Sequence, residues 1–535
     1  MEKDPVDFFY YRNTLGQGVF RLRSFQSWYS LHYLAQNLPV SSVVLENPTF
    51  GRFKKEVAAG NYQVVAITFS VITTGRVLAM AEWLKQTFPE TEIILGGYGT
   101  AVFRDPDASA RRLQELADRV CFGEGLAFLR EYLKERWSIS RNLPLRQDFL
   151  PMTHCFVRTG IPLFQQLVVV GSLGCTYGCP FCATSSQFRR RRIRIASGRQ
   201  LFDLLLRQAR QHPRVQSAII YDEDFLLDRR EVMEFMGCME ESRELRERPL
   251  LLTIFSSVRS IRRYTMDELV RCGIGTIYIG VESFQQEVLQ AEGLNKREGD
   301  VGELFARLHR HGINTLGSLI IGWDGQSREE MDRDIDRFVR LNPTFYQVVP
   351  LHPVPGTPLW DRMRKEGRIQ RDYTFQGDSI GRFTFSLDRL THDEALEGVE
   401  RTYRGLVAEG GPWPFRLYEV LLSGYLSLRS HPNPLMRERA RAYRKMIPRI
   451  LPLAAASRVF FRRGRFSGRW SRTMKETFEV FPYQTLVGML GGLAVSLVFS
   501  GLYIMAHLLQ LLRPHGDQPP KIRRAYGSFP TDAPA

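Results

Sequence analysis

Three of the chain's seven cysteines lie close together in the stretch GSLGCTYGCPFCATS, residues 171–185. Cys175, Cys179 and Cys182 have the spacing C-x3-C-x2-C and directly follow the apolar run QLVVVGSL. A loop at the end of a strand can fold three thiolates around one metal centre. A four-iron cluster held by three cysteines keeps one iron without a protein ligand, and that iron can bind a substrate or cosubstrate. The spacing therefore predicts an iron–sulfur cluster with an open iron.

A structural zinc site is the alternative for these cysteines. Zinc in such a site takes four protein ligands, and no second C-x2-C or H-x3-H pair occurs in the chain. His154 or Cys155 would have to complete it. The odd number and uneven spacing of the cysteines argue against a secreted disulfide framework, so we expect a reducing cytosol. The cysteines outside the triplet and the 154–155 pair are expected to be small buried side chains: Cys121, Cys238 and Cys272.

Carboxylates follow two later apolar runs. Asp222, Glu223 and Asp224 come after SAIIY, and Glu282 and Ser283 come after TIYIGV. An unpaired carboxylate at the end of a buried strand is costly, so we expect Glu282 to have a cationic partner. The three consecutive acidic residues have an alternative role, because carboxylates also favour the first turn of a helix.

The elements that must position these residues alternate between strand and helix. Apolar runs separated by helical patterns predict six βα units, an incomplete relative of the eight-unit barrel, over residues 166–390. The predicted strands are QLVVVGSL, SAIIYDED, LLTIFSSV, TIYIGVES, NTLGSLIIG and FYQVVPLHP. In such barrels the active site lies at the carboxyl ends of the strands, where the cysteines and acidic residues occur.

Residues 1–143 predict a separate doubly wound, flavodoxin-like domain of about five parallel strands, the first being DFFYYRN. A Pro-containing linker is expected over 144–165. Ligands of doubly wound domains bind at the carboxyl ends of the strands. The residues at those ends that we expect to approach a ligand are Gly96, Gly97, Gly99, Gly123, Glu124 and Gly125.

The last quarter of the chain is basic and ends in an apolar segment. Residues 401–535 contain 21 Lys and Arg against 7 Asp and Glu, which is +14 of the net charge of +16. We expect a basic helical region over 391–482, a transmembrane helix over 483–510 and a disordered tail over 511–535. A membrane is thus favoured over nucleic acid as the polyanionic partner. A buried helix of a soluble protein is the alternative. Every fourth position from Gly488 to Ser500 is small, which predicts a face on which another helix packs.

These features in this order resemble the radical S-adenosylmethionine (SAM) enzymes with an N-terminal vitamin B12-binding domain. The cysteine spacing matches, with an aromatic residue before the last cysteine. The other matching motifs are the acidic segment YDEDF (221–225), GVES (280–283), the glycine loop IIGWDGQS (320–327) and the proline loop PVPGTPLW (353–360). The N-terminal domain resembles the family in its strand order and in its GG-x-G-T and FGEG segments.

The resemblance implies a [4Fe-4S] cluster on the three cysteines, with SAM chelating the fourth iron. It also implies that the acidic segment and Glu282–Ser283 lie beside SAM, and that cobalamin binds at the glycines of the N-terminal domain. The chain departs from the family in one motif, because D-x-H-x-x-G is replaced by TLGQGVFRL. His32, the one histidine before residue 154, is expected to be a helix-surface or core residue. Cobalamin would then bind without a protein histidine, or would have been lost.

The resemblance further implies an enzyme that cleaves SAM to a 5′-deoxyadenosyl radical and modifies an unactivated carbon. Methyl transfer is the expected reaction, and oxidation, cyclisation or C–C coupling without methyl transfer is the alternative. A non-catalytic membrane scaffold with a structural cluster is a third hypothesis. An external reductant such as ferredoxin or flavodoxin is expected. The basic apolar C-terminus favours a membrane lipid, polyprenoid or pigment precursor as substrate, and a location on the cytoplasmic face of the membrane. An anchor that only sets location is the alternative.

Overall fold

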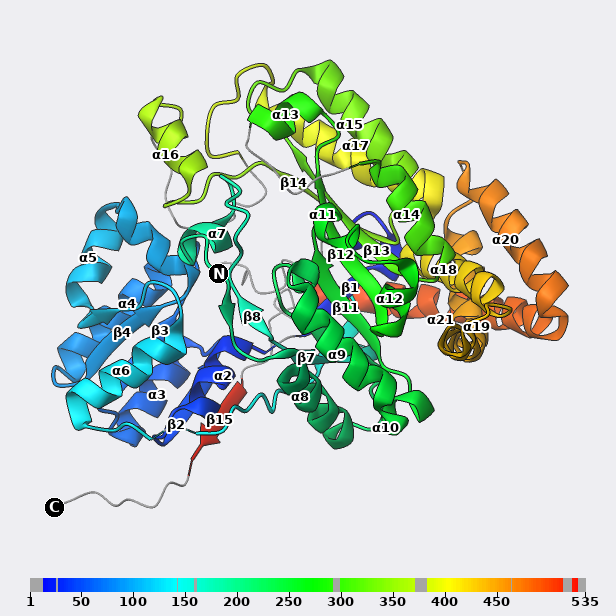
Figure 1. Cartoon of the computed structure of the whole chain (residues 1–535). Helices are drawn as coiled ribbons and strands as arrows, with labels where there is room; N and C mark the ends of the chain where they lie inside the picture. Colours follow the sequence, from blue (N-terminus) through cyan, green and yellow to red (C-terminus); the bar gives the residue numbers. More distant parts are fainter. Residues whose placement is uncertain are drawn as a thin grey trace.

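The computed structural model describes residues 13–25, 27–141, 143–157, 161–291, 299–370, 383–462, 464–512 and 522–527. Figure 1 shows an N-terminal α/β unit (blue), a curved sheet with its helices (green) and a helical C-terminal region (yellow to red). The curved sheet and the C-terminal helices share one hydrophobic core, whereas the N-terminal unit has a core of its own. The predicted α/β architecture is thereby confirmed at the level of these parts.

The central sheet is a half-barrel of eight strands in the order β1-β6-β7-β10-β11-β12-β13-β14. The six strands from β7 to β14 are parallel and correspond to the six predicted βα units. Buried side chains occupy every position of β13, as expected for a parallel strand covered on both faces. The strands of this sheet are β1 (Leu22–Phe25), β6 (Met152–Phe156), β7 (Pro162–Val169), β10 (Ser217–Ile220), β11 (Leu251–Ser256), β12 (Ile274–Glu282), β13 (Asn314–Ile321) and β14 (Phe345–Pro350).

Most helices of this region cover the outer face of the half-barrel, whereas two of them, α7 (Ala183–Gln187) and α16 (Pro358–Lys365), lie beside the N-terminal unit. Three of them begin with a reciprocal capping box, in which the side chains of residues N-cap and N3 satisfy each other's backbone N–H groups. Their bounds are α7 (Ala183–Gln187), α8 (Gly198–Gln211), η4 (Phe225–Leu227), α9 (Arg229–Glu241), α10 (Arg243–Glu247), α11 (Val258–Ile261), α12 (Met266–Arg271), α13 (Gln286–Ala291), α14 (Val301–Arg310), α15 (Arg328–Leu341) and α16 (Pro358–Lys365). A short ladder of β8 (Ser172–Leu173) and β9 (Ile193–Arg194) flanks the cysteine loop.

The segment predicted as a linker is partly a strand. Within 144–165, β6 pairs antiparallel with β7 on one side and with β1 on the other, so both extend the half-barrel sheet. His154 of β6 is fully buried, and its ring stacks on Phe164. Prolines and the absence of a long apolar run made this segment look like a loop, but Pro151 lies just before β6 and Pro162 is the first residue of β7, positions at which a strand tolerates proline.

The N-terminal unit has a smaller parallel sheet than predicted. The parallel ladder contains β3, β4 and β5, not about five strands. The predicted first strand, DFFYYRN, lies almost entirely outside the described residues. The elements of this unit are α2 (Tyr29–Asn37), β2 (Ser42–Glu46), α3 (Phe50–Gly60), β3 (Val64–Thr68), α4 (Thr74–Thr87), β4 (Glu92–Gly96), η3 (Tyr98–Arg104), α5 (Ala108–Leu116), β5 (Arg119–Val120) and α6 (Gly125–Trp137). The short helix η2 (Gly18–Phe20) packs on the C-terminal helical region instead.

The C-terminus contributes a strand to the N-terminal unit. Within the segment predicted to be disordered, β15 (Ile522–Tyr526) pairs antiparallel with β2, and Figure 1 shows the two side by side. Arg523 donates two hydrogen bonds to Glu56, and Tyr526 is bonded to His32. Charge and proline around this short strand hid it from a sequence-based prediction, whereas pairing with the edge of β2 stabilises it. Residues 513–521 and 528–535 of the predicted tail lie outside the described residues.

The C-terminal region consists of α17 (His392–Gly410), α18 (Trp413–Leu428), α19 (Pro434–Phe460), α20 (Phe466–Val480) and α21 (Pro482–Leu512). Among the described residues, α21 alone is long and apolar enough to cross a membrane by length and composition, over Pro482–Met505 with a mean hydropathy of 1.9. The predicted small face of this helix packs within the chain, against α19.

Candidate active site

The cysteine loop leaves the carboxyl end of β7 and leads into α7. Cys175 and Cys179 are buried, and Cys182, at the N-cap of α7, is partly exposed. The Cys182 backbone N–H donates to the Cys179 carbonyl at 3.0 Å. Gly174 and Gly178 in this loop have positive φ. A Cβ on Gly174 would lie 2.3 Å from the Arg191 carbonyl oxygen, so only glycine fits there.

Asp222, after β10, holds the entrance to this loop. Its carboxylate accepts hydrogen bonds from the backbone N–H groups of Gly171 and Ser172, both at 2.8 Å, and from the Ser172 hydroxyl at 2.8 Å. Arg192 lies 3.4 Å away. Burial raises the pKa of Asp222, and the Ser172 donors oppose that rise. Since its oxygens already have donors in the protein, Asp222 serves to position the loop.

Asp224 has a similar role toward the next strand. It accepts hydrogen bonds from the hydroxyls of Ser256, Ser257 and Ser260 at 2.7–2.8 Å. The Tyr177 hydroxyl, inside the cysteine loop, is bonded to Ser257 at 3.0 Å and Ser260 at 2.9 Å. The cysteine loop is therefore connected to the end of β11 through this serine network.

Glu223 differs from its two acidic neighbours. Its backbone and side chain lie beside the cysteine loop, where the Gly174 N–H donates to the carboxylate. Its Oε2 is buried and has no hydrogen-bond partner. Burial is the main cause that raises the pKa of Glu223 to about 7. A buried carboxylate oxygen without a donor fits a cationic group of a bound ligand, because such an oxygen is costly when left unpaired.

Glu282, the last residue of β12, has φ +64°, a conformation that non-glycine residues rarely adopt. A register shift between Gly280 and Glu282 accompanies it. Its carboxylate accepts a hydrogen bond from Ser318 at 3.2 Å, so a polar partner is present on β13. Strained backbone of this kind clusters at functional sites. Ser283 is fully buried, and its hydroxyl donates to Asp334 of α15 at 2.6 Å. This hydrogen bond ties the segment after β12 to α15.

The glycine and proline loops contact the cysteine loop, as their shared sheet edge predicts. The ring of Trp323 meets Phe181 edge to face at 5.5 Å, and its Nε1–H donates to the Glu282 carbonyl at 3.2 Å. The Leu359 backbone N–H donates to the Pro180 carbonyl at 3.1 Å. The structure thus brings all five sequence motifs together at the carboxyl edge of the half-barrel.

Tyr98 of the N-terminal unit was missed by the sequence analysis, which considered only the glycines around it. Its hydroxyl shares a hydrogen bond of 3.0 Å with Thr184, two residues after Cys182. Although 42% of its surface is exposed, burial of the hydroxyl and the charge of Glu223 raise its pKa. Tyr98 therefore lies next to the cysteine loop. An aromatic residue inside a glycine loop was the available signal.

The predicted glycines of this edge divide into two groups. A Cβ on Gly97 would lie 2.4 Å from Thr68 Oγ1, and one on Gly99 would lie 2.2 Å from Phe69, so packing inside the domain explains both. Gly96, Gly123 and Gly125 have ordinary or open surroundings. Glu124 caps α6 by accepting from the Leu126 and Ala127 N–H groups at 2.8 and 2.6 Å.

His32 is excluded as a cobalt ligand in this arrangement. It is buried, and its two ring nitrogens are bonded to Tyr526 and to Glu46 at 2.6 Å. Of the two predicted alternatives, a helix-surface or a core residue, the structure shows a core residue. If cobalamin binds at this edge, it binds without an imidazole from the N-terminal unit, which has His32 as its one histidine.

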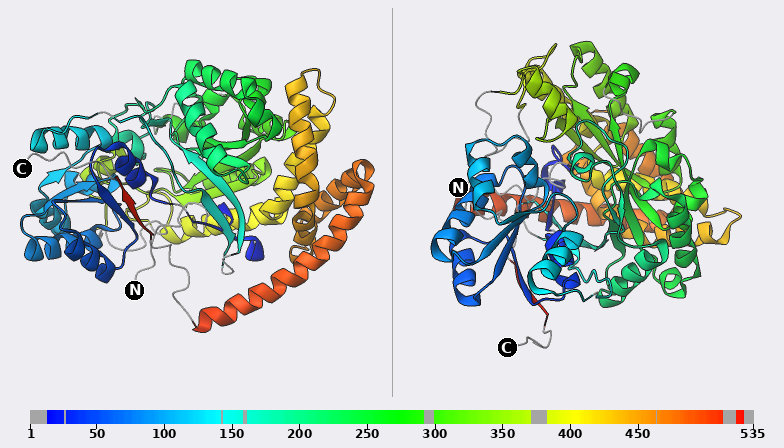
Figure 2. Two further views of the ribbon diagram at one scale, coloured as in Figure 1. Left: turned by 90° about the horizontal axis from the view of Figure 1, so that it is seen from below. Right: turned by 60° about the vertical axis from the view of Figure 1, so that its left-hand side comes forward.

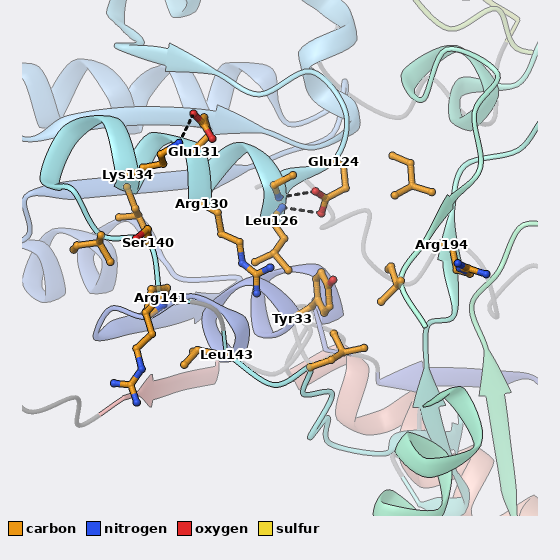
Figure 3. Close-up of a pocket in the computed structure, with 17 residues that line it drawn as sticks. Tyr33, Glu124, Leu126, Arg130, Glu131, Lys134, Ser140, Arg141, Leu143 and Arg194 are labelled. Carbon is orange, nitrogen blue, oxygen red and sulfur yellow. Dashed lines mark hydrogen bonds and ion pairs between the residues drawn. The ribbon is translucent and has the colours of Figure 1, made fainter. Parts of the chain in front are cut away.

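A pocket of about 550 Å³ lies between α6 and α2 on one side and β9 on the other. Figure 3 shows Glu124, Arg130 and Tyr33 on one wall and Arg194 across from them. The pocket extends from the carboxyl edge of the N-terminal sheet along α6. The pocket reaches Glu124, which belongs to the predicted Gly123–Gly125 segment.

The alternative zinc site does not form. His154 has its Nδ1 bonded to Ser24 and its Nε2 to Gln166, at 2.7 and 2.8 Å, and Cys155 is buried in β6 between two strands. Burial lowers the pKa of His154 to about 4. Across the described part of the chain, no three His, Cys, Asp or Glu side chains converge on a point that would hold a single ion. Cysteines of a four-iron cluster each bind a different iron and need no such convergence.

Comparison with known proteins agrees with this geometry. Residues 169–338, from the end of β7 into α15, match the radical SAM superfamily. The hopanoid C-2 methylase of Rhodopseudomonas palustris is 24% identical over 205 residues, which are 38% of either chain. The bacteriochlorophyllide d C-12(1)-methyltransferase of Chlorobaculum tepidum is 26% identical over 253 residues, 45% of this chain and 52% of that one. The chain thus spans about half, or less, of the length of these curated relatives.

Among solved structures, the cobalamin-dependent SAM radical enzyme OxsB, with aqua-cobalamin and SAM bound, superposes with a TM-score of 0.50. The match covers 88% of this chain and 74% of that one at 13% identity, so the likeness is one of fold. It extends over both the half-barrel and the N-terminal unit, because neither alone accounts for that coverage. Residues 169–338 thus match a superfamily of enzymes that use a [4Fe-4S] cluster and SAM, and the fold of the chain is similar to that of OxsB.

Proposed function

We propose that this enzyme transfers a methyl group to an unactivated carbon in a cobalamin-dependent radical reaction, with a membrane lipid, polyprenoid or pigment precursor as substrate. The observation that carries the proposal is the cysteine loop with three thiols and no fourth, held beside a carboxylate oxygen that has no partner. Two curated relatives are named as methylases of a hopanoid and of a bacteriochlorophyllide, which supports methyl transfer.

In this proposal, Cys175, Cys179 and Cys182 hold the cluster and leave one iron for the amine and carboxylate of SAM. Glu223 pairs with the cationic part of SAM, and Glu282 closes the site from β12. Glu223 is near the cysteine loop because the Gly174 N–H donates to its carboxylate. Glu282 is near the loop because its carbonyl accepts from Trp323, whose ring packs on Phe181. When bound, the cluster supplies the electron that cleaves SAM to a 5′-deoxyadenosyl radical, and cobalamin supplies the methyl group.

The remaining site residues orient these groups and exclude water. Asp222 fixes the start of the cysteine loop through buried hydrogen bonds, and Asp224 holds the middle of the loop through the serines that bond Tyr177. Tyr98 closes the side toward the N-terminal unit, where cobalamin would meet the backbone at Gly96, Gly97, Gly99 and Gly123–Gly125. Ser283 supports the loop from behind. We expect an external reductant such as ferredoxin or flavodoxin to supply the electron.

The membrane part of the proposal rests on the C-terminal region. The net charge after residue 400 is strongly positive, and α21 is apolar along its described length. We place the protein on the cytoplasmic face of the membrane, where the thiols stay reduced and a hydrophobic substrate is at hand.

Mass spectrometry of membrane lipids tests the proposal. Anaerobic cells would express wild type, Cys179→Ala or the control Cys272→Ala, a buried cysteine of the half-barrel distant from the loop in sequence. A species heavier by one CH2 in wild type and control, absent with Cys179→Ala, is the expected result, together with S-adenosylhomocysteine. Loss of two hydrogens or joined chains would replace methyl transfer by oxidation or coupling. Unchanged lipids, with 5′-deoxyadenosine still formed by the pure protein, would overturn the lipid substrate.

A further inference from the structure

We propose that α21 lies in the plane of the membrane interface instead of crossing the bilayer, with one face on the protein and the other in contact with an anionic lipid surface. The inference rests on the membrane association proposed above and replaces the spanning geometry that its length and composition predict. It requires that one face of the helix is already buried by the protein and that both of its ends stay on one side of the membrane.

The inner face of α21 is packed against α19 by small residues. A Cβ on Gly488 would lie 2.4 Å from Leu451, and one on Gly492 would lie 2.6 Å from Ala455, so the two helix backbones approach closely. Ser496, further along the same face, is 5% exposed. The small face that the sequence offers to a partner helix is therefore occupied within this chain, and this side of α21 cannot face lipid.

Aromatic contacts hold the second half of the helix to the half-barrel. The ring of Phe499 lies 4.7 Å from that of Phe156 on β6 and 5.9 Å from that of Phe20, both in edge-to-face geometry. Phe20 is fully buried, so this contact belongs to a packed cluster and not to the surface. Edge-to-face pairs of this kind stabilise packing beyond the area that they bury. The helix is thus fixed to the sheet at its second half as well as to α19 at its first.

The opposite face forms a continuous apolar surface, which we call the outer stripe. Its members recur with the three- and four-residue spacing of one helix face. Their exposed fractions run from 50% at Met505 to 77% at Leu497. The outer stripe consists of Tyr483, Leu486, Val487, Leu490, Leu493, Leu497, Val498, Ile504 and Met505. Figure 2 shows α21 along one margin of the molecule, with its far side turned away from the other elements. A contiguous exposed apolar surface of this length marks a contact with a membrane or a protein.

Both ends of α21 return to the same folded body. Before it, Phe481 is buried and packs on Tyr425 of α18 at 5.2 Å. After it, β15 pairs with β2 over five residue pairs from Ile522↔Glu46 to Tyr526↔Ser42. A helix that crossed the hydrocarbon core, about 30 Å thick, would leave β15 on the opposite side from β2. Strand pairing and spanning therefore exclude each other in one molecule, whereas a helix lying in the interface allows both.

Charge decides between a lipid surface and a second copy of the chain. On α19, which packs against α21, four exposed basic residues lie on the turns that precede the contact at Leu451: Arg441, Arg444, Lys445 and Arg449. A symmetric dimer through the outer stripe would bring the same basic residues of two copies toward each other. Anionic headgroups instead attract such residues beside an apolar helix face, by about 1 kcal/mol for each one near the surface. We therefore commit to an anionic bilayer as the occupant.

Vesicle flotation tests the contact surface. Full-length protein is mixed with phosphatidylcholine vesicles that contain or lack phosphatidylglycerol. Wild type should float with the anionic vesicles and far less with the neutral ones. The double variant Leu490→Lys/Leu497→Lys should bind at least about tenfold more weakly, because it places two charges in the outer stripe. The control Leu150→Lys makes the same change at a side chain that is 44% exposed and lies outside α21, and it should float like wild type. Formation of 5′-deoxyadenosine in detergent shows that each variant is folded.

Topology tests the geometry. Inverted membrane vesicles from cells that express the chain with one tag at each end are treated with protease from outside. Both tags should be removed together. In the same vesicles, Val43→Cys/Ala525→Cys, which are register partners of β2 and β15, should form an intramolecular disulfide, and Val43→Cys alone should not. A protected C-terminal tag without the disulfide would overturn the in-plane helix while leaving membrane association in place.

Two further outcomes separate this inference from the proposed function. If wild type does not float and light scattering finds a dimer that Leu490→Lys/Leu497→Lys dissolves, the outer stripe binds a second copy, and both the inference and the membrane location are overturned. A different outcome is that the protein floats, that both tags are removed by protease, and that the membrane lipids are unmodified. This result would support the in-plane helix and overturn only the proposed lipid substrate.

Discussion

The half-barrel and the N-terminal unit are both alternations of strand and helix, yet they hold their candidate residues in different ways. In the half-barrel, buried hydrogen bonds from three strand ends meet on the cysteine loop, and Glu223 keeps one buried oxygen without a partner. In the N-terminal unit, the strand-end residues Gly97, Gly99 and Glu124 are explained by contacts within the unit itself. An unsatisfied polar atom in a connected network therefore says more about ligand binding than a glycine at a strand end.

The largest difference is expected at the cysteines. Cys182→Ala should abolish 5′-deoxyadenosine formation and lower the bound iron, because two thiolates cannot hold the cluster in place of three. Cys238→Ala, a buried cysteine of α9, should keep both within about twofold, since it lies outside the loop. Iron analysis and product chromatography measure the two. Equal iron content in both variants would remove the cysteine loop from the site.

A large loss of stability is expected from Asp222→Asn. The change removes a carboxylate that accepts three hydrogen bonds and faces Arg192, and it places an amide N–H against donors, which costs about 3–5 kcal/mol of unfolding free energy. Denaturant unfolding measures this cost. Asp203→Asn, at an exposed position of α8, should change it by less than about 0.5 kcal/mol. Similar values for both would show that Asp222 does not position the loop.

His154 of β6 predicts that the stability of the protein depends on pH. Burial lowers the pKa of His154 to about 4, so the folded protein keeps it neutral, whereas the unfolded chain protonates it below about 6.5. The stability that it contributes is present above pH 6.5 and is lost as the pH falls, by about 2 kcal/mol at pH 5. His154→Gln should flatten this part of the profile in urea unfolding. His309 and His352, whose pKa values burial lowers to about 3 and about 4, retain the remaining slope.

Glu223→Gln should weaken SAM binding about tenfold, equal to about 1.4 kcal/mol, because the amide cannot pair with a cation. The fold should be unchanged, since Oε2 has no partner to lose. Equilibrium dialysis with the cluster-loaded protein gives the affinity, and Glu234→Gln on the exposed side of α9 is the matched control. Loss of stability without loss of affinity would assign Glu223 a structural role instead.

The smallest effect is expected in the N-terminal unit. Tyr98→Phe removes one hydrogen bond to Thr184 and should cost about 1 kcal/mol or less of stability. SAM cleavage should stay within about twofold, while methyl transfer falls, because Tyr98 faces the site from the proposed cobalamin side. An equal loss of SAM cleavage and methyl transfer would contradict the proposal that the half-barrel cleaves SAM and the N-terminal unit serves methyl transfer.

Much of the half-barrel was predictable because its information is local. Apolar runs of β-branched residues mark its strands, and each motif follows a strand directly, so parallel pairing brings Cys179, Asp222 and Glu282 to one edge. The sequence could not tell which acidic residue keeps an unpaired oxygen, because Asp222, Glu223 and Asp224 are adjacent and alike. That distinction depends on which donors from other strands reach each carboxylate.

The edges of the molecule were predicted less well. The strands β1, β6 and β15 are short, polar or proline-flanked, and they form because a neighbouring edge offers hydrogen bonds. For α21, length and hydropathy predict a helix that crosses a membrane, and they do not show which of its faces packs on the protein. The sequence by itself thus determined the helix, the half-barrel and the cysteine motif, since each follows from local pattern. The tertiary structure decided which face of α21 is exposed and that its ends meet one body, because pairing of β15 with β2 joins residues far apart in the chain.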